Sequence, residues 1–218
     1  MAEIPPNVLP IFEKLKSEII WIHGRWIIYR QIFAKSQRRI DLLNECASTF
    51  FYVIQNVLIG EVQISLSKLM DPAQTRGSEN LSLKTLYEKI ALEGDVELTR
   101  RLNGVLERLR IQCEPFRTWR NKRLAHLDLK ASLESELNPL PGVSREMIEE
   151  GLVLVRLFMN EIERAYLDSE TGYEHFILDH GDGDGLIAML RYGLRYKELL
   201  KEEKIAYGDW RNGNWHDA

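Results

Sequence analysis

The segment between residues 115 and 128, PFRTWRNKRLAHLD, brings together residue types that can act on a phosphodiester. Arg120 presents a fixed fork of N–H donors to phosphate oxygens and keeps its charge. His126 can accept or release a proton near neutral pH, and Asn121 offers a neutral donor and acceptor. Positioned acid-base groups of this kind accelerate reactions about 10²- to 10⁴-fold. We therefore take Arg120, Asn121 and His126 as the candidate catalytic residues, with no metal and no cofactor required.

The same segment is basic, although the chain as a whole is not. Residues 100–130 contain nine Lys and Arg against three Asp and Glu, whereas the 218-residue chain has a formal net charge of −4. A local positive charge can neutralise several backbone phosphates and gives salt-sensitive binding. The candidate residues for binding a nucleic acid beside the catalytic ones are Arg117, Lys122, Arg123 and the neighbouring Asp128. Four arginines before the segment are most simply paired with acidic neighbours, namely Arg100, Arg101, Arg108 and Arg110 with Glu97 and Glu107.

The spacing of the candidate catalytic residues raises a geometric problem. On a regular helix of about 3.6 residues per turn, residues six apart point about 120° away from each other, so Arg120 and His126 do not share a face. Either the helix ends near Ala125 and the histidine turns back, or a second copy of the chain completes the site across a two-fold axis. Pro115 lacks a backbone N–H, so we expect it in the first turn of a new helix that carries the segment.

Apolar residues recur every three or four positions along most of the chain, which is the spacing of one helical face. The pattern predicts a first helix up to about residue 34, further helices over 39–69, 82–93, 95–114, 144–168 and 186–203, and a helix that starts at residue 115. No long stretch alternates as a strand does, and residues 73–80 are expected to form a loop. The sequence predicts an all-α, antiparallel helical bundle of about six to seven helices. One domain is expected over residues 1–203, followed by a polar tail over 204–218.

The second helix is the most apolar, and it is expected to lie deep in the bundle or at a dimer seam. Its main stripe is Leu43, Ala47, Phe50, Ile54, Leu58, Val62, Leu66 and Leu69, broadened by Phe51 and Val57. Helix N-caps are predicted at Ser82, Asp95, Ser144 and Asp184, because their side-chain oxygens can accept first-turn N–H groups. His23 lies beside the stripe of the first helix, where a lone histidine is expected to be structural.

Metal binding and membrane insertion are not expected. The segment DHGDGDG over 179–185 fails as a calcium loop, because placing Gly185 at the glycine position puts His180 first and Arg191 last. The two cysteines lack metal-binding spacing and are expected to be buried thiols. The N-terminus lacks the features of a signal peptide, and the most apolar run, 50–59, is shorter than the roughly 20 residues of a membrane span. We therefore expect a cytoplasmic protein with no metal.

The order of Arg120, Asn121 and His126, written RNKRLAH, resembles the signature of the HEPN superfamily of all-α ribonucleases and nucleotide-binding domains. The tryptophan-containing first helix, the SKLMDP turn near residue 70 and the NLSL segment after it resemble the bacterial abortive-infection AbiU-like branch. The resemblance covers most of residues 8–200.

This resemblance implies a homodimer in which two motifs face each other and line one RNA-cleaving cleft. Arg120 would stabilise charge on the scissile phosphate, His126 would move a proton to or from the ribose 2′-hydroxyl or the leaving oxygen, and Asn121 would orient one of them. The expected products carry a 2′,3′-cyclic phosphate and a 5′-hydroxyl. Members regulated by adenylylation carry a Tyr two residues after the His, and Asp128 at that position argues against this control. An antitoxin or another protein of the same defence system is a further expected partner.

Two other interpretations of the basic segment remain open. The first is a non-catalytic helical module that binds RNA, a nucleotide or a protein, and it needs no protonatable His126. The second is a structural bundle in which the segment only pairs with acidic side chains. The second interpretation expects Arg120 to be buried in an intrachain salt bridge, away from any cleft.

Overall fold

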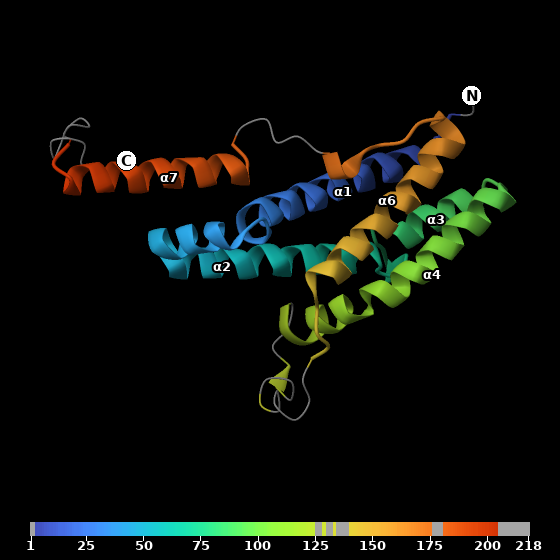
Figure 1. Cartoon of the computed structure of the whole chain (residues 1–218). Helices are drawn as coiled ribbons and strands as arrows, with labels where there is room; N and C mark the ends of the chain where they lie inside the picture. Colours follow the sequence, from blue (N-terminus) through green and yellow to red (C-terminus); the bar gives the residue numbers. More distant parts are fainter. Residues whose placement is uncertain (1–2, 125–127, 130–132, 134–139, 176–180, 205–218) are drawn as a thin grey trace. The chain divides into compact units, whose positions relative to one another are not determined.

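The computed structural model describes residues 3–124, 128–129, 133, 140–175 and 181–204. Its helices are α1 (Leu9–Tyr29), α2 (Gln37–Leu69), α3 (Leu83–Ala91), α4 (Val96–Trp119), α6 (Arg145–Leu167) and α7 (Gly183–Lys201), as Figure 1 shows. The shorter elements are the π-helical turns η1 (Arg30–Ala34) and η2 (Arg120–Leu124), the 3₁₀ turn η3 (Tyr173–His175), and the strands β1 (Gln74–Thr75) and β2 (Ser78–Glu79). The predicted all-α class is confirmed.

Contacts within the chain group the residues into two compact units. Unit 1 comprises Met1–Ile27 and Asn56–Ile177, and unit 2 comprises Ile28–Gln55 and Leu178–Ala218. The first part of α2 therefore belongs to unit 2 and its last part to unit 1. The single domain predicted over residues 1–203 stays a prediction. Of the predicted tail, residues 205–218 lie outside the described part of the chain.

Unit 1 is built around the face of α1 that the sequence predicted to be buried. Phe12, Leu15 and Ile19 are at most 2% exposed. Further along the same face, the Trp26 side chain is buried and its Nε1 donates to Glu149 Oε1 of α6 at 2.7 Å. A tryptophan with a bonded indole N–H can be buried without leaving a polar group unsatisfied. This bond joins the end of the apolar stripe to α6.

The α4 and α6 helices lie side by side in unit 1 (Figure 1). Two polar contacts join these helices. Gln112 Nε2 donates to the Met147 backbone oxygen at 2.9 Å, and Arg101 Nε lies 2.8 Å from Glu161 Oε2. The predicted N-caps Ser82, Asp95 and Ser144 are confirmed, because they accept the N–H groups of Thr85, Leu98 and Met147 at 3.2, 2.9 and 3.1 Å.

The middle of α2 is not buried within the chain, so the first of its two expected placements, deep in the bundle, does not hold there. Leu43, Val62, Leu66 and Leu69 are buried as predicted, but Phe50 and Val57 are each 58% exposed, while Phe51 is buried. The backbone at Ala47 is not helical, with φ −164° and ψ 71°, so α2 consists of two helical segments. The sequence pattern assumed one continuous register and placed both Phe50 and Phe51 on the buried stripe. The other expected placement, at a dimer seam, stays a prediction.

By length and composition alone, α2 is also apolar enough to cross a membrane, and it is the one such helix in the part of the chain that the structure describes. Core helices of soluble proteins pass the same test, so this property is weak evidence for a membrane span. The prediction that the chain has no membrane partner stays a prediction.

Unit 2 joins the start of α2 to α7 through η1. Gln31 bonds in both directions with the beginning of α7: its Nε2 donates to Asp182 Oδ2 at 2.7 Å, and its Oε1 accepts from Gly183 N at 2.9 Å. Gly183 is needed at this contact, because a Cβ there would lie 2.9 Å from Ile32 Cγ1. The close approach of the two backbones therefore depends on glycine.

The predicted N-cap of the last helix is wrong by two residues. Asp182, and not Asp184, accepts the N–H of Gly185 at 2.9 Å, and α7 begins at Gly183. The Asp184 carboxylate instead pairs with Lys35 at 3.1 Å and Arg39 at 2.5 Å. Although partial burial opposes them, these two cations hold the pKa of Asp184 below its usual value. Ion pairs with residues far away in the sequence thus decide which aspartate caps the helix.

Pro115 lies inside α4 and does not begin a new helix, which contradicts the sequence prediction. A proline in a helix interior costs about 3 kcal/mol or more, because one backbone bond is lost and the ring meets the preceding turn. Cys113 and Phe116 on either side are fully buried, and an added Cβ at Gly151 of α6 would lie 3.6 Å from Phe116 Cε2. Burial of a Phe side chain is worth about 1.5–3 kcal/mol. Packing on α6 therefore offsets the local preference and keeps α4 continuous.

Candidate active site

Arg120 is the first residue of η2, the π-helical turn that follows α4 in unit 1. Its Nη1 donates to Oδ1 of Asp71 at 2.8 Å, and Asp71 lies just after the end of α2. The two side chains are 19% and 25% exposed, so the pair is largely shielded from solvent. Arg120 Nε also donates to Asn121 Oδ1 at 3.3 Å. Two predicted catalytic residues are thus in contact, and an acid from a distant part of the chain holds the guanidinium.

The remaining donors of this cluster define what it can do chemically. A guanidinium has five N–H donors, and the bonds to Asp71 and Asn121 use two of them. Asn121 accepts with its oxygen and keeps its amide N–H groups as donors. Arg120 can therefore hold a phosphate oxygen while Asp71 fixes its orientation. The negative charge of Asp71 reduces the local positive charge, so the cluster is suited to hold an anion by directed hydrogen bonds more than by net charge.

The predicted RNA-binding residues lie at the end of α4 and in η2. Lys122 and Arg123 are exposed, whereas Arg117 is half-buried and its Nη1 lies 3.9 Å from Glu114 Oε2. Asp128 is also half-buried, and its backbone N donates to the Lys122 oxygen at 3.1 Å. No observation tests whether these four residues bind RNA. The Trp119 indole, which donates to the Pro141 oxygen at 2.6 Å, joins this end of α4 to the segment before α6.

His126 lies outside the described residues, as do Ala125 and Leu127. Its distance from Arg120 is therefore not defined, and its catalytic role stays a prediction. The last residue described before this gap is Leu124 of η2, so both arrangements that would allow His126 to approach Arg120 stay predictions.

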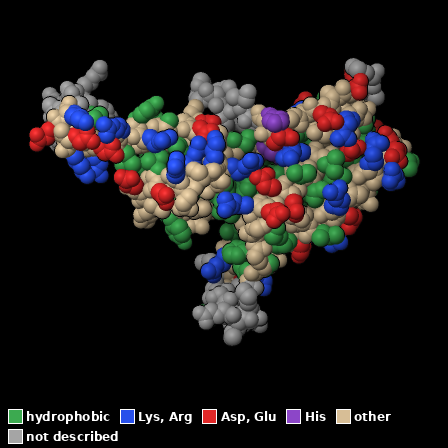
Figure 2. Space-filling model, viewed as in Figure 1, with side chains coloured by type: hydrophobic (Ala, Val, Ile, Leu, Met, Phe, Trp, Pro, Cys, Tyr) green, Lys and Arg blue, Asp and Glu red, His purple; other side chains and the backbone are tan. Residues whose placement is uncertain are grey.

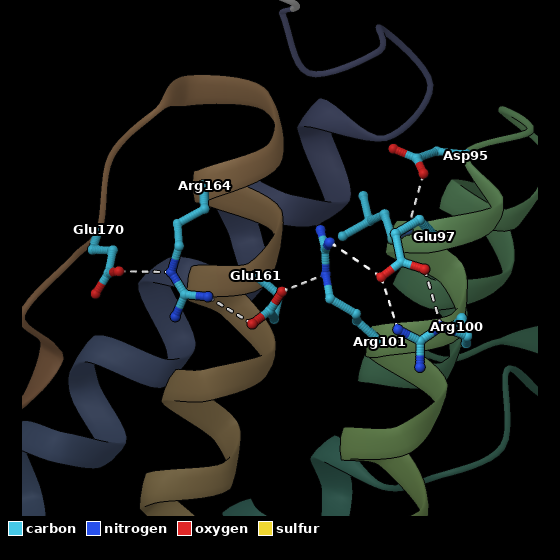
Figure 3. Close-up of polar contacts among 8 residues, drawn as sticks. Asp95, Glu97, Arg100, Arg101, Glu161, Arg164 and Glu170 are labelled. Carbon is cyan, nitrogen blue, oxygen red and sulfur yellow. Dashed lines mark hydrogen bonds and ion pairs between the residues drawn. The ribbon is translucent and has the colours of Figure 1, made fainter.

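Most of the arginines before the motif are held in ion pairs, as the sequence predicted. Figure 3 shows the pairs Arg100–Glu97, Arg101–Glu97 and Arg101–Glu161, at 2.8, 3.6 and 2.8 Å. A fourth pair, Arg110–Glu107, has a distance of 3.0 Å. The hydrogen bond from Arg100 holds the pKa of the Glu97 carboxyl below its usual value. On the face shown in Figure 2, Lys and Arg side chains alternate with Asp and Glu over α4 and α6. These ion pairs neutralise part of the local charge excess of the sequence.

His23 is buried, with 2% of its surface exposed. Its Nδ1 lies 2.9 Å from the Ile19 oxygen, and its Nε2 lies 3.3 Å from Nη1 of Arg156. Burial lowers the pKa of His23 to about 4, with the Ile19 bond opposing this shift and the Arg156 charge adding to it. A neutral imidazole fixed between α1 and α6 matches the structural role that the sequence predicted.

Among the described residues, no group of three or more His, Cys, Asp or Glu side chains could hold a metal ion. Part of the segment 179–185 lies outside these residues. Cys113 is fully buried, and burial raises its pKa to about 12, whereas Cys46 is half-buried. Both cysteines are free thiols.

Asp71 is the residue that the sequence analysis missed. Asp71 belongs to the SKLMDP turn, one of the features that resemble the AbiU-like branch, but nothing in that resemblance marks it as a site residue. Its partner Arg120 is 49 residues further along the chain. Residue spacing within one helix cannot reveal a contact over that separation. The available signal was an isolated acidic residue at the end of a long apolar helix.

An all-α domain with a shielded arginine at the head of an RNKRLAH segment is a domain of the HEPN class, of which nuclease-like and abortive-infection modules are members. The family model described as AbiU2 matches residues 6–184, and the chain belongs to this HEPN_AbiU2 family. The predicted superfamily and branch are both confirmed. No curated protein and no solved structure gives a significant match.

Proposed function

We propose that this protein is a metal-independent endoribonuclease of a bacterial defence system, acting in the cytoplasm at a composite site of a homodimer. The observation that carries the proposal is the contact between Arg120, Asn121 and Asp71, together with the family. The contact fixes a guanidinium at the end of α4 with donors left for a phosphate. A preorganised donor stabilises developing charge better than a mobile one, because it needs no reorganisation during the reaction.

The proposed reaction begins with attack of the ribose 2′-oxygen on the adjacent phosphorus. The 2′-hydroxyl loses its proton, a 2′-O–P bond forms, and the P–O5′ bond breaks as O5′ gains a proton. Arg120 stabilises the charge on the non-bridging phosphate oxygens, and His126 carries one of the two protons. Asn121 orients Arg120 through its side-chain oxygen. The products are a 2′,3′-cyclic phosphate and a 5′-hydroxyl.

The homodimer in this proposal is supported by the exposed apolar side chains of unit 2. Phe50 and Val53 of α2 are 58% and 50% exposed, and Met189 and Tyr192 of α7 are 69% and 70% exposed. Several large apolar side chains that remain exposed to water are typical of an interaction surface. A second copy of the chain is the partner that the composite site requires.

The dimer is tested by the molar mass in solution, measured by light scattering after gel filtration. The expected mass is twice the 25.5 kDa of the chain. Met189→Glu should shift the protein toward the monomer, whereas Ile111→Glu, at a similarly exposed position in unit 1, should not. A monomeric wild type would remove the composite site from the proposal. Binding of the wild type to liposomes would assign the apolar surface to a membrane instead.

One observation favours a structural role for the basic segment over a catalytic one. Arg120 is engaged in an intrachain ion pair and the neighbouring arginines are paired with acids, which is what the structural bundle described above expects. A non-catalytic module that binds RNA, a nucleotide or a protein is the second candidate function. It would not depend on the proton transfer that His126 supplies in the nuclease.

The deciding experiment is cleavage of a labelled structured RNA in excess EDTA. Wild type, Arg120→Ala and His126→Ala are compared with Arg110→Ala, which removes an exposed, paired charge from the same helix. We expect cyclic-phosphate products from wild type and Arg110→Ala only. The loss from His126→Ala should be about 10²-fold or more, since general acid-base catalysis is of that size. No cleavage by wild type, with salt-sensitive RNA binding retained, would favour the non-catalytic module.

A further inference from the structure

The segment between Asp71 and Asn80 forms a small hairpin and not the loop that the sequence predicts. Strands β1 and β2 pair antiparallel, with Gln74 opposite Glu79 and Thr75 opposite Ser78, so only Arg76 and Gly77 form the turn. Their φ angles are 50° and 85°. A two-residue turn with both central φ angles positive is the type I′ turn, which favours Asn or Gly at the first position. Arg76 therefore occupies a left-handed position that is unfavourable for a side chain like arginine.

The hairpin is held rigid by Asn80. The Nδ2 of Asn80 donates to the Pro72 oxygen at 2.6 Å and to Thr75 Oγ1 at 2.8 Å, and its backbone N donates to the Ala73 oxygen at 2.8 Å. Thr85 Oγ1 in turn donates to the Asn80 oxygen at 2.6 Å. A two-stranded hairpin alone is marginally stable in water. These bonds fix it to the start of α3, so the position of its tip is defined.

The tip of the hairpin carries an available positive charge. Arg76 is exposed and has no ion pair with any residue that the structure describes. The only acid on the strands, Glu79, lies 3.7 Å from Lys89 Nζ and is thus partly neutralised. A Cβ added at Gly77 would meet nothing within 4 Å, so the tip projects into open space. The guanidinium is therefore presented to a ligand and not used to hold the fold.

The base of the same hairpin adjoins the candidate active site. Asp71, which binds Arg120, directly precedes Pro72, to which Asn80 is bonded. Five residues of extended chain span at most about 17 Å, so the backbone of Arg76 lies within that distance of Asp71. A single RNA strand that places a phosphate at Arg120 has further phosphates within this range. The side chains of Arg76 and Arg120 can therefore reach the same RNA strand.

We propose that Arg76, at the tip of the β1–β2 hairpin, binds a backbone phosphate of the RNA strand that Arg120 engages. The inference rests on the proposed function for the identity of the ligand, and it adds a substrate-binding residue outside the RNKRLAH segment. A charge carried on a rigid hairpin next to the Arg120 site would fix the register of the strand. Phosphate contacts position a nucleic acid without reading its bases.

The test uses the full-length protein and a 12-nucleotide, fluorescein-labelled 2′-O-methyl RNA, which 2′-hydroxyl attack cannot cleave. Its Kd is measured by fluorescence anisotropy from 50 to 200 mM salt for wild type, Arg76→Gly, Arg76→Lys and the charge-matched control Arg110→Ala. We expect Arg76→Gly to weaken binding about fivefold and to reduce the salt slope by about 0.7, the value for one single-strand phosphate. Arg76→Lys should stay within about twofold of wild type, because it keeps the charge.

The glycine variant separates an RNA contact from a role in the turn. Glycine suits the left-handed φ of position 76, so the Tm of Arg76→Gly should stay within about 2 °C of wild type. A loss of affinity without a loss of stability therefore supports the contact. Equal affinities of wild type and Arg76→Gly, or equal losses for Arg76→Gly and Arg110→Ala, would overturn it. The probe cannot be cleaved, so this binding test does not depend on nuclease activity. If the protein had no nuclease activity, the proposed function would fail, but the measured effect of Arg76→Gly on binding would still decide the role of Arg76.

Discussion

The ion pair between Arg120 and Asp71 gives the sharpest prediction, because a structural and a functional arginine differ in what their loss does. At the observed 2.8 Å and an effective dielectric constant of about 20, the Coulomb attraction is about 6 kcal/mol, and desolvation of the two groups offsets most of it. Exposed pairs contribute about 0.2–1 kcal/mol, and loss of one partner of a buried pair costs about 3–5 kcal/mol. At 19% and 25% side-chain exposure, this pair should have a coupling free energy of about 1–2 kcal/mol.

The coupling is measured with Asp71→Asn, Arg120→Gln and the double variant in urea unfolding followed by tryptophan fluorescence. Each single variant should lower the unfolding free energy by about 1–2 kcal/mol, and the double variant should lose less than the sum of the two losses. The same proteins are then titrated with uncleavable RNA. Under the proposed function, Arg120→Gln weakens RNA binding, whereas Asp71→Asn leaves it equal or stronger because a negative charge is removed from the site.

Two results would refute this reasoning. A coupling free energy below about 0.3 kcal/mol, the usual error of such cycles, would mean that the pair does not hold Arg120 in solution. If Arg120→Gln binds RNA as tightly as wild type but shows the whole predicted loss of unfolding free energy, Arg120 is a structural residue. That second outcome is the one expected for a bundle in which the RNKRLAH segment serves only the fold.

Three further predictions concern the stability of the fold. The pKa of His23 is about 4 in the folded protein and 6.5 in the unfolded chain, so the unfolding free energy falls by about 3 kcal/mol as the pH is lowered from 6.5 to 4. His23→Gln should remove this part of the pH dependence, as measured by urea unfolding. Gly183→Ala should lower the Tm by several degrees, because its Cβ would lie 2.9 Å from Ile32 Cγ1, whereas Gly104→Ala, with open space around it, should not. Pro115→Ala should raise the unfolding free energy by about 1–2 kcal/mol, since it restores a helical N–H, and a loss would show that the ring itself contributes to packing.

The sequence alone determined the class of the fold and the local signals of its helices. The apolar stripe of α1 is buried as predicted, and the caps Ser82, Asp95 and Ser144 bond as predicted. These features depend on residues three or four apart, so their physical causes are contained in short windows of sequence. The motif RNKRLAH, with its context, also identified the family, which the match over residues 6–184 confirms.

Tertiary structure decided the features that depend on distant residues. Packing of Phe116 against α6 keeps α4 continuous through Pro115, and beyond the break at Ala47 Phe50 is exposed while Phe51 is buried. The same holds at the site, where Asp71 meets Arg120 across 49 residues. Periodicity reports which face of a helix is apolar, but it carries no information on which distant group a polar side chain will meet. The sequence therefore supplied the chemical groups of the candidate site, and the fold selected the carboxylate that holds its arginine in place.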